Sequence, residues 1–311
     1  MNSPGSSRQP GEDGSPAATT PVDGVAHLPD GRRLVTMSAG EGAVEGTGDG
    51  PDLVVFEAGL GFSGRYWGPV QEALARLAPQ VRTLAYDRAG LGESTPDAQP
   101  RDPARLTDDL DHLIDAHPHR RLVLVGHSWG GPIVRLVAAR RLARGLPPTG
   151  LALIDASDER ADLYFGAAAT VGDALYTAVL PVLGRLGLLR PVFGALASGL
   201  PEPYRTATVA ASSTPSAARA TAAENRHIQP GLAALRRHPP ALPGVPTVVV
   251  SGGRAGPLER RSRRQLNEAH AATAAAHDGR HVVTPRSGHL VPITEPDLVA
   301  GVVLELLQAG E

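Results

Sequence analysis

The chain of 311 residues contains no cysteine. This absence excludes disulfide bonds, thiolate catalysis and cysteine-based metal sites together. It leaves the cellular compartment open, because a protein without disulfides can reside anywhere. No run of about eighteen uncharged apolar residues is present either, so the sequence predicts no membrane span.

Lysine is absent as well, so that all 30 basic residues are arginine. With abundant alanine, glycine and proline, this composition is typical of codon bias in a GC-rich bacterial genome, and arginine clusters receive little functional weight. The formal net charge of −2 argues against a general affinity for nucleic acid or for anionic membranes. Residues 1–20 are rich in Ser, Pro and Gly and lack the apolar stretch of a secretory signal. We therefore expect a disordered tail there and a cytoplasmic location.

Short apolar strands alternate with helical patterns along most of the chain. A hairpin is predicted at residues 22–39, and further strands at 53–57, 81–86, 122–126, 151–155, 247–251 and 280–284. Helical patterns cover residues 66–77, 106–116, 132–144 and 296–308. This alternation predicts an α/β fold with a mostly parallel sheet and helices on both faces.

The strand pattern stops between residues 158 and 242. Only Ala- and Leu-rich helical segments broken by prolines occur there. We predict a helical cap at residues 158–242, inserted into a core of residues 21–157 and 243–311. Apolar cap side chains such as Leu163, Tyr164 and Phe193 would close a pocket or pack against the core.

The most informative motif is Gly126-His-Ser128-Trp-Gly130, which lies between an apolar strand and a helical pattern. In this context a G-x-S-x-G sequence predicts a sharp turn with a strained, exposed serine at its apex. Glycines at both ends let the strand and the helix approach closely. Ser128 is therefore the candidate nucleophile.

A serine hydroxyl needs a base to remove its proton, and a histidine on a neighbouring loop is the usual choice. Of eleven histidines, His289 is best placed, because it follows the last predicted strand and precedes the last helix. His127 adjoins the serine but should point away from it and pack or hydrogen-bond. His277 and His281 lack acidic partners for a metal site, so no metal and no cofactor are predicted.

The chain resembles the capped serine hydrolases of the α/β-hydrolase superfamily. Four motifs carry the resemblance, namely Glu57-Ala-Gly-Leu-Gly61, Tyr86-Asp-Arg-Ala-Gly-Leu-Gly-Glu-Ser94, Gly126-His-Ser-Trp-Gly130 and Ser287-Gly-His289. The resemblance implies an eight-stranded sheet, with Ser128 as nucleophile and His289 as base. It also implies an oxyanion hole made by the backbone N–H groups of Leu60 and Trp129.

The catalytic acid departs from the commonest family pattern. Many members carry it after the strand that corresponds to residues 247–251, but here Gly252-Gly-Arg-Ala-Gly256 follows. The family alternative is the end of the preceding strand, where Asp155 closes an apolar run. Asp158 is the second candidate and Glu259 the third. Asp87 and Arg88 are expected to tie a turn, and the Arg260–Arg264 run to form a solvated helix face.

These features predict a serine hydrolase that cleaves an ester or a related acyl compound through an acyl-enzyme. Its partner would be a small acyl substrate, not nucleic acid. Peptidase, iminopeptidase or amidase activity on the same triad is one alternative. A catalytically slow protein that binds a small molecule is another. The substrate and the oligomeric state stay open, because fold alone does not fix them.

Overall fold

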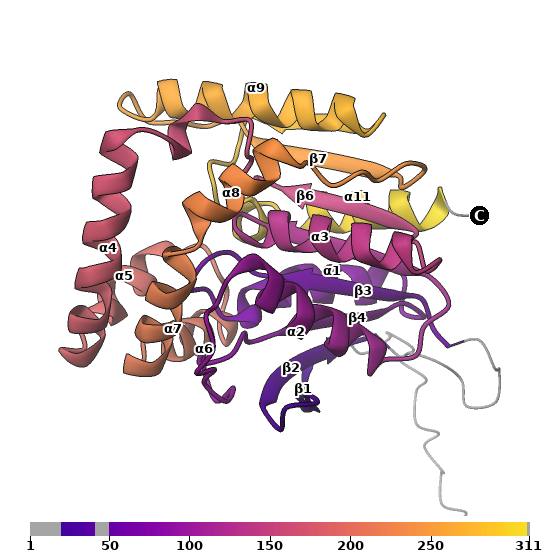
Figure 1. Ribbon diagram of the computed structural model, residues 1–311. Coiled ribbons are helices and arrows are strands. Elements are labelled where there is room, and N and C mark those ends of the chain that lie inside the picture. Colours follow the sequence, from indigo (N-terminus) through magenta and orange to yellow (C-terminus); the bar gives the residue numbers. More distant parts are fainter. Residues whose placement is uncertain (1–19, 41–49, 310–311) are drawn as a thin grey trace, which may run out of the picture.

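Eight strands form one sheet in the computed structural model, which describes residues 20–40 and 50–309 (Figure 1). The spatial order is β1-β2-β4-β3-β5-β6-β7-β8. The hairpin strands β1 and β2 pair antiparallel, β2 pairs antiparallel with β4, and every other neighbouring pair is parallel. The predicted mostly parallel eight-stranded sheet is therefore confirmed. The predicted tail lies outside the described residues except for residue 20.

The strands coincide closely with the predicted apolar runs. Their bounds are β1 Val22–His27, β2 Arg33–Ala39, β3 Leu53–Glu57, β4 Arg82–Tyr86, β5 Leu122–His127, β6 Gly150–Ile154, β7 Thr247–Gly252 and β8 Arg280–Thr284. The central strands β3, β5 and β6 are largely apolar because both of their faces are buried. In β3, Val54 and Phe56 point into one core layer, whereas Leu53 and Val55 point into the other.

Helices cover both faces of the sheet, and one short helix follows the last strand. On one face lie α1 (Gly68–Leu77), preceded by the 3₁₀ turn η1 (Gly64–Trp67), and α11 (Pro296–Gln308). On the other lie α2 (Pro103–Asp115), α3 (Gly130–Ala143) and α9 (Arg260–Ala276). The short α10 (Val291–Thr294) leads from the loop after β8 into α11.

The chain between β6 and β7 contains helices and no strand among its residues, all of which are described. It comprises η2 (Asp162–Tyr164), α4 (Ala167–Arg185), α5 (Leu189–Leu196), α6 (Tyr204–Ser212), α7 (Pro215–Asn225) and α8 (Ile228–Arg237). Helices α4 to α7 gather at one end of the sheet (Figure 1). A buried ion pair joins them to the core, because Arg88 contacts Glu224 of α7 at 2.9 Å.

Helix α4 is long, apolar and mostly exposed. By length and apolar content it could cross a membrane, yet only 11% of its most apolar stretch is buried. Asp173 interrupts its apolar sequence, so no uncharged run long enough to predict a membrane span occurs here.

Candidate active site

The turn between β5 and α3 places Ser128 at its apex. Ser128 has φ +53°, a left-handed conformation that is uncommon for residues other than glycine. A Cβ atom at Gly126 would lie 2.6 Å from the carbonyl oxygen of Gly130, and one at Gly130 would lie 2.5 Å from that of Glu57. The structure therefore has both predicted features, a strained backbone at the serine and two positions where the chain approaches too closely for any residue but glycine.

His289 lies on the loop between β8 and α10 and reaches Ser128 across the carboxyl edge of the sheet. Its Nε2 is 3.1 Å from Ser128 Oγ, within hydrogen-bond distance. The two residues are 161 positions apart in the chain. The His289 side chain is 45% exposed, so a substrate in solvent can approach it.

Asp155 follows β6 and faces the other nitrogen of the same ring. Its Oδ2 is 2.7 Å from His289 Nδ1, and its Oδ1 accepts hydrogen bonds from the backbone N–H of Gly252 (2.9 Å) and from Arg263 (2.5 Å). The carboxylate is fully buried. Burial acts to raise the pKa of Asp155, but the hydrogen bonds from His289 and Arg263 outweigh it and hold this pKa well below its ordinary value. Asp155 is therefore an anion at neutral pH.

The other two acid candidates lie elsewhere. Asp158 is buried and accepts hydrogen bonds from Thr273 Oγ1 (2.6 Å) and from the backbone N–H of Arg160 (2.8 Å). Glu259 is exposed and accepts a hydrogen bond from Gly256. The structure thus brings Ser128, His289 and Asp155 together. Asp158 bonds Thr273 and a backbone N–H instead of His289.

Arg263 is the residue beside the site that the sequence analysis missed. The expectation of a solvated face for the Arg260–Arg264 run is wrong at this position, because the Arg263 side chain is only 14% exposed and pairs with Asp155. The pairing arises because α9 packs against β7, the neighbour of β6, and Asp155 directly follows β6. A positive charge next to the candidate acid lowers the effective negative charge that the acid presents to His289.

The loop that carries the first predicted oxyanion donor, Leu60, lies beside the serine, because a Cβ atom at Gly59 would be 3.2 Å from Ser128 Cβ. The second predicted donor, Trp129, follows Ser128 directly. Neither the Leu60 N–H nor the Trp129 N–H donates a hydrogen bond within the described part of the chain, so both are free for a ligand. Arg88 holds the first donor's loop in place, because its guanidinium donates to the carbonyl oxygens of Ala58 (2.7 Å) and Gly59 (2.9 Å). Arg88 is only 1% exposed and forms an ion pair with Glu57, so a buried ion pair holds the guanidinium that supports this loop.

Hydrogen bonds through His127 connect the loop that contains Gly59 and Leu60 with the loop that carries His289. Its Nε2 is 2.9 Å from the His289 carbonyl oxygen, which can only accept, so Nε2 carries the proton. Its Nδ1 then accepts from the Tyr66 hydroxyl (3.0 Å), which in turn accepts from the Gly59 N–H (3.3 Å). Burial lowers the pKa of His127 to about 3, which keeps the ring neutral. As expected, His127 is a hydrogen-bonding neighbour that does not contact the serine hydroxyl.

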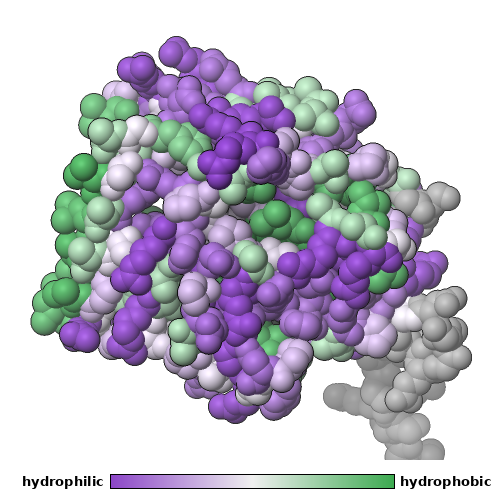
Figure 2. Space-filling model, viewed as in Figure 1, coloured by the Kyte–Doolittle hydropathy of each residue, from purple (hydrophilic) through white to green (hydrophobic). Residues whose placement is uncertain are grey.

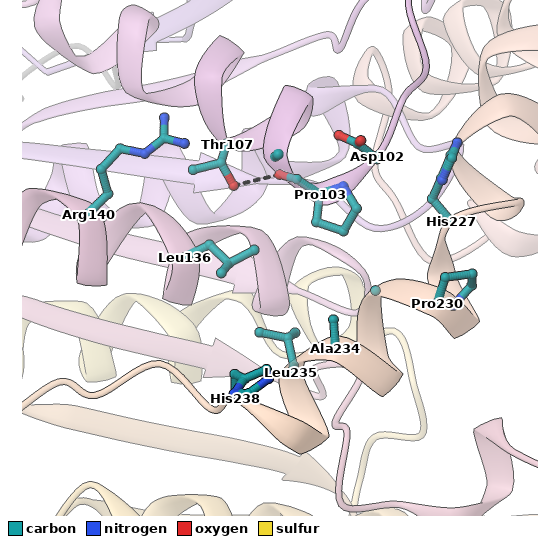
Figure 3. A pocket seen from close by; sticks show the side chains of 12 residues that line it. Asp102, Pro103, Thr107, Leu136, Arg140, His227, Pro230, Ala234, Leu235 and His238 are labelled. Carbon is teal, nitrogen blue, oxygen red and sulfur yellow. Dashed lines mark hydrogen bonds between the residues drawn. The ribbon is translucent and has the colours of Figure 1, made fainter.

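A cavity of about 250 Å³ borders His289. Its walls include Leu163 and Tyr164 from η2 and Arg254 after β7. A larger cavity of about 570 Å³ lies between α2, α3 and α8, where Leu136, Leu235 and His238 line it, and no residue of the Ser128–His289–Asp155 triad does (Figure 3). The smaller cavity is therefore the one that could receive part of a substrate held at the triad.

No group of three or more His, Asp or Glu side chains in residues 20–40 and 50–309 is arranged to hold a metal ion. His281 and His270, on neighbouring elements, each lie 2.7 Å from Ser251 Oγ and are part of a buried hydrogen-bonded cluster.

Comparisons with known proteins concern the family and the fold of the chain. The model of the alpha/beta hydrolase family matches residues 54–302, well over half of the chain. The RutD protein of Caulobacter vibrioides, proposed to be a carbamate hydrolase, is 36% identical over 83 residues. That match covers 26% of this chain and 30% of the relative, so it spans less than a third of the relative's length.

Solved structures of the same fold match over almost the whole chain. An epoxide hydrolase, CorEH, has a TM-score of 0.69 at 18% identity and covers 93% of this chain and 99% of its own. Cfl2 of Burkholderia cenocepacia has a TM-score of 0.69 at 20% identity and covers 94% of this chain and 97% of its own. At these identities the likeness concerns the fold alone.

Proposed function

Because this chain belongs to the alpha/beta hydrolase family, we propose that it is a serine hydrolase that cleaves an ester or a related acyl compound. One observation carries the proposal. The His289 ring is held between Ser128 Oγ at 3.1 Å and the buried carboxylate of Asp155 at 2.7 Å. This is the arrangement that a nucleophilic serine, its base and an orienting acid require.

The first half-reaction forms the acyl-enzyme. Ser128 Oγ attacks the carbonyl carbon while His289 Nε2 takes its proton, and Asp155 stabilises the imidazolium that results. The carbonyl oxygen becomes an oxyanion, which accepts hydrogen bonds from the N–H groups of Leu60 and Trp129. Each such donor contributes about 3 kcal/mol to transition-state stability in related chemistry. The imidazolium then protonates the leaving alkoxide as the carbon–oxygen bond breaks.

The second half-reaction releases the acid. Water enters where the alcohol has left, and His289 takes one of its protons as the oxygen attacks the acyl carbon. Collapse of the second tetrahedral intermediate returns that proton to Ser128 Oγ and frees the carboxylic acid. Because the His289 side chain is 45% exposed, water can reach this position from solvent.

A serine at position 128 disfavours epoxide hydrolysis and dehalogenation on this scaffold, since those reactions need a carboxylate nucleophile there. Amides and carbamates carry the same kind of carbonyl group, and the partial similarity to a RutD protein supports testing carbamates beside esters. The rival interpretation is a protein that binds an acyl compound and turns it over slowly.

The test uses p-nitrophenyl esters of graded chain length, an aryl carbamate and a fluorophosphonate probe that labels activated serines. Wild type should turn over at least one acyl compound and be labelled once. Ser128→Ala should lose both properties. Ser198→Ala is the control and should keep both properties, because Ser198 is exposed and does not line the cavity at His289. A folded wild-type protein without labelling would favour the binding protein, and full turnover by Ser128→Ala would refute the mechanism.

A further inference from the structure

An exposed apolar band runs along α4 and into α5. Nine of the fifteen large apolar side chains that are exposed in the described residues fall between positions 171 and 196. They are Val171, Leu175, Tyr176, Val179, Val182, Leu186, Leu188, Val192 and Leu196. In the space-filling view a continuous apolar edge follows these helices at the left of the molecule (Figure 2). Such a concentration on one face marks an interaction surface.

The band is one side of a helix whose other side is already occupied. Residues 171, 175, 179, 182 and 186 repeat at helical spacing and so share a face. On the opposite side, the Asn225 side chain of α7 donates to Thr177 Oγ1 (2.9 Å) and to the Asp173 carbonyl oxygen (3.2 Å). Gly184 packs directly against Ala218 of α7. Helix α4 is thus anchored in the fold, and its outer face has no partner within the described residues.

Charge identifies the kind of partner. Residues 158–242, the predicted cap, contain eight arginines and six acidic residues, a net charge of +2 with histidine neutral. The whole chain carries −2, so the remainder carries −4. The predicted cap and the core therefore carry net charges of opposite sign. Arg185 and Arg190 are exposed beside Leu186 and Leu188, whereas Asp173 is the single acidic residue between 163 and 201.

We propose that the α4–α5 face adsorbs to an anionic lipid surface and lies in its interface. Apolar side chains would enter the boundary between headgroups and acyl chains, while Arg185 and Arg190 would contact lipid phosphates. The hydrogen bonds that tie α4 to α7 keep the helix in the plane of the surface and oppose a spanning orientation. A symmetric dimer through the same face would bring both arginine pairs into one interface, which is unfavourable. The proposal does not depend on the hydrolase activity.

The test measures co-sedimentation of the full chain with vesicles of phosphatidylcholine alone and of an equal mixture with phosphatidylglycerol. Wild type should bind the mixed vesicles more tightly, and added salt should weaken that binding. The variant Leu175→Gln/Val182→Gln/Leu186→Gln should bind both vesicles at least about tenfold more weakly. Arg185→Gln/Arg190→Gln should lose about tenfold on mixed vesicles only, together with most of the salt dependence.

A double variant, Leu146→Gln/Leu258→Gln, is the matched control, since it removes two exposed apolar side chains from other parts of the surface. It should bind as wild type does. Failure of wild type to bind mixed vesicles, or full binding by the triple glutamine variant, overturns the proposal. So does a concentration-dependent dimer that the triple variant abolishes without any vesicle binding. Turnover of a soluble short-chain ester, measured on every variant, tests the hydrolase proposal separately.

Discussion

Replacing Asp155 with asparagine should switch the protonation of His289 without moving its ring. Asp155 Oδ1 accepts from two donors, the Gly252 N–H and the Arg263 guanidinium. An amide nitrogen cannot accept these bonds, so the asparagine oxygen must take the Oδ1 position. The amide N–H then faces His289 Nδ1, which is 2.7 Å away in the wild type. Nδ1 must accept this bond, and the ring proton therefore moves to Nε2.

A proton on Nε2 faces Ser128 Oγ and prevents the ring from acting as a base. Tautomer reversal of this kind lowers kcat by about 10⁴-fold, which corresponds to about 5.4 kcal/mol of transition-state stability. KM should change little, because the ring and the oxyanion donors keep their positions. Residual turnover should persist through the Leu60 and Trp129 N–H groups.

The assay compares kcat and KM of wild type, Asp155→Asn and Asp158→Asn on the best ester, well below each melting temperature. Asp158→Asn is the control, because its carboxylate bonds Thr273 and a backbone N–H away from His289. It should cost about 1 kcal/mol of stability and leave kcat within a few-fold. Labelling by a fluorophosphonate should slow in step with kcat. Equal losses in both variants, or a loss in Asp158→Asn alone, would refute the assignment of Asp155.

Three further predictions concern the charged side chains of Arg263, Arg88 and Asp97. Arg263→Gln should move the acid limb of the kcat/KM profile to higher pH, since the Asp155 carboxylate would no longer share its charge with a guanidinium. Arg263→Lys should leave the acid limb in place. An unchanged acid limb in Arg263→Gln would contradict this reasoning. Arg88→Met should lower the free energy of unfolding by about 3–5 kcal/mol in chemical denaturation, because Glu57 and Glu224 would remain buried without their cation. Burial acts to raise the pKa of Asp97, but hydrogen bonds and nearby arginines lower it to about 2, from an ordinary value of 3.8. The stability from Asp97 is therefore full above about pH 4 and is lost as pH falls toward 2, so Asp97→Asn should flatten the pH dependence of the melting temperature in that window.

Much of the sheet could be predicted because its central strands are buried on both faces. Residues 53–57, all of them buried, form a strand with the predicted bounds. Such strands form unbroken apolar runs, which end where the chain meets solvent at the sheet edge. The order of the strands in space is not encoded in any single run, and the motif resemblance supplied only their number. The exposed apolar face of α4 does not stand out as an uncharged run, because Asp173 interrupts it.

In the candidate site, too, some features depend on residues close together in the sequence and others on residues far apart. The turn at Ser128 is local, since two glycines and one serine within five residues define it. The partnership of Arg263 with Asp155 joins residues 108 positions apart, and no local pattern contains it. A weaker signal does exist in α9. Leu266, Ala269 and His270 form its buried side, and Arg263 precedes Leu266 by three positions, which places it on the same side of the helix. An arginine on the buried side of a helix must find an anion, because burying an unpaired charge is costly. Periodicity therefore singles out Arg263 among its neighbours as the arginine that needs a buried carboxylate, although it does not say which one.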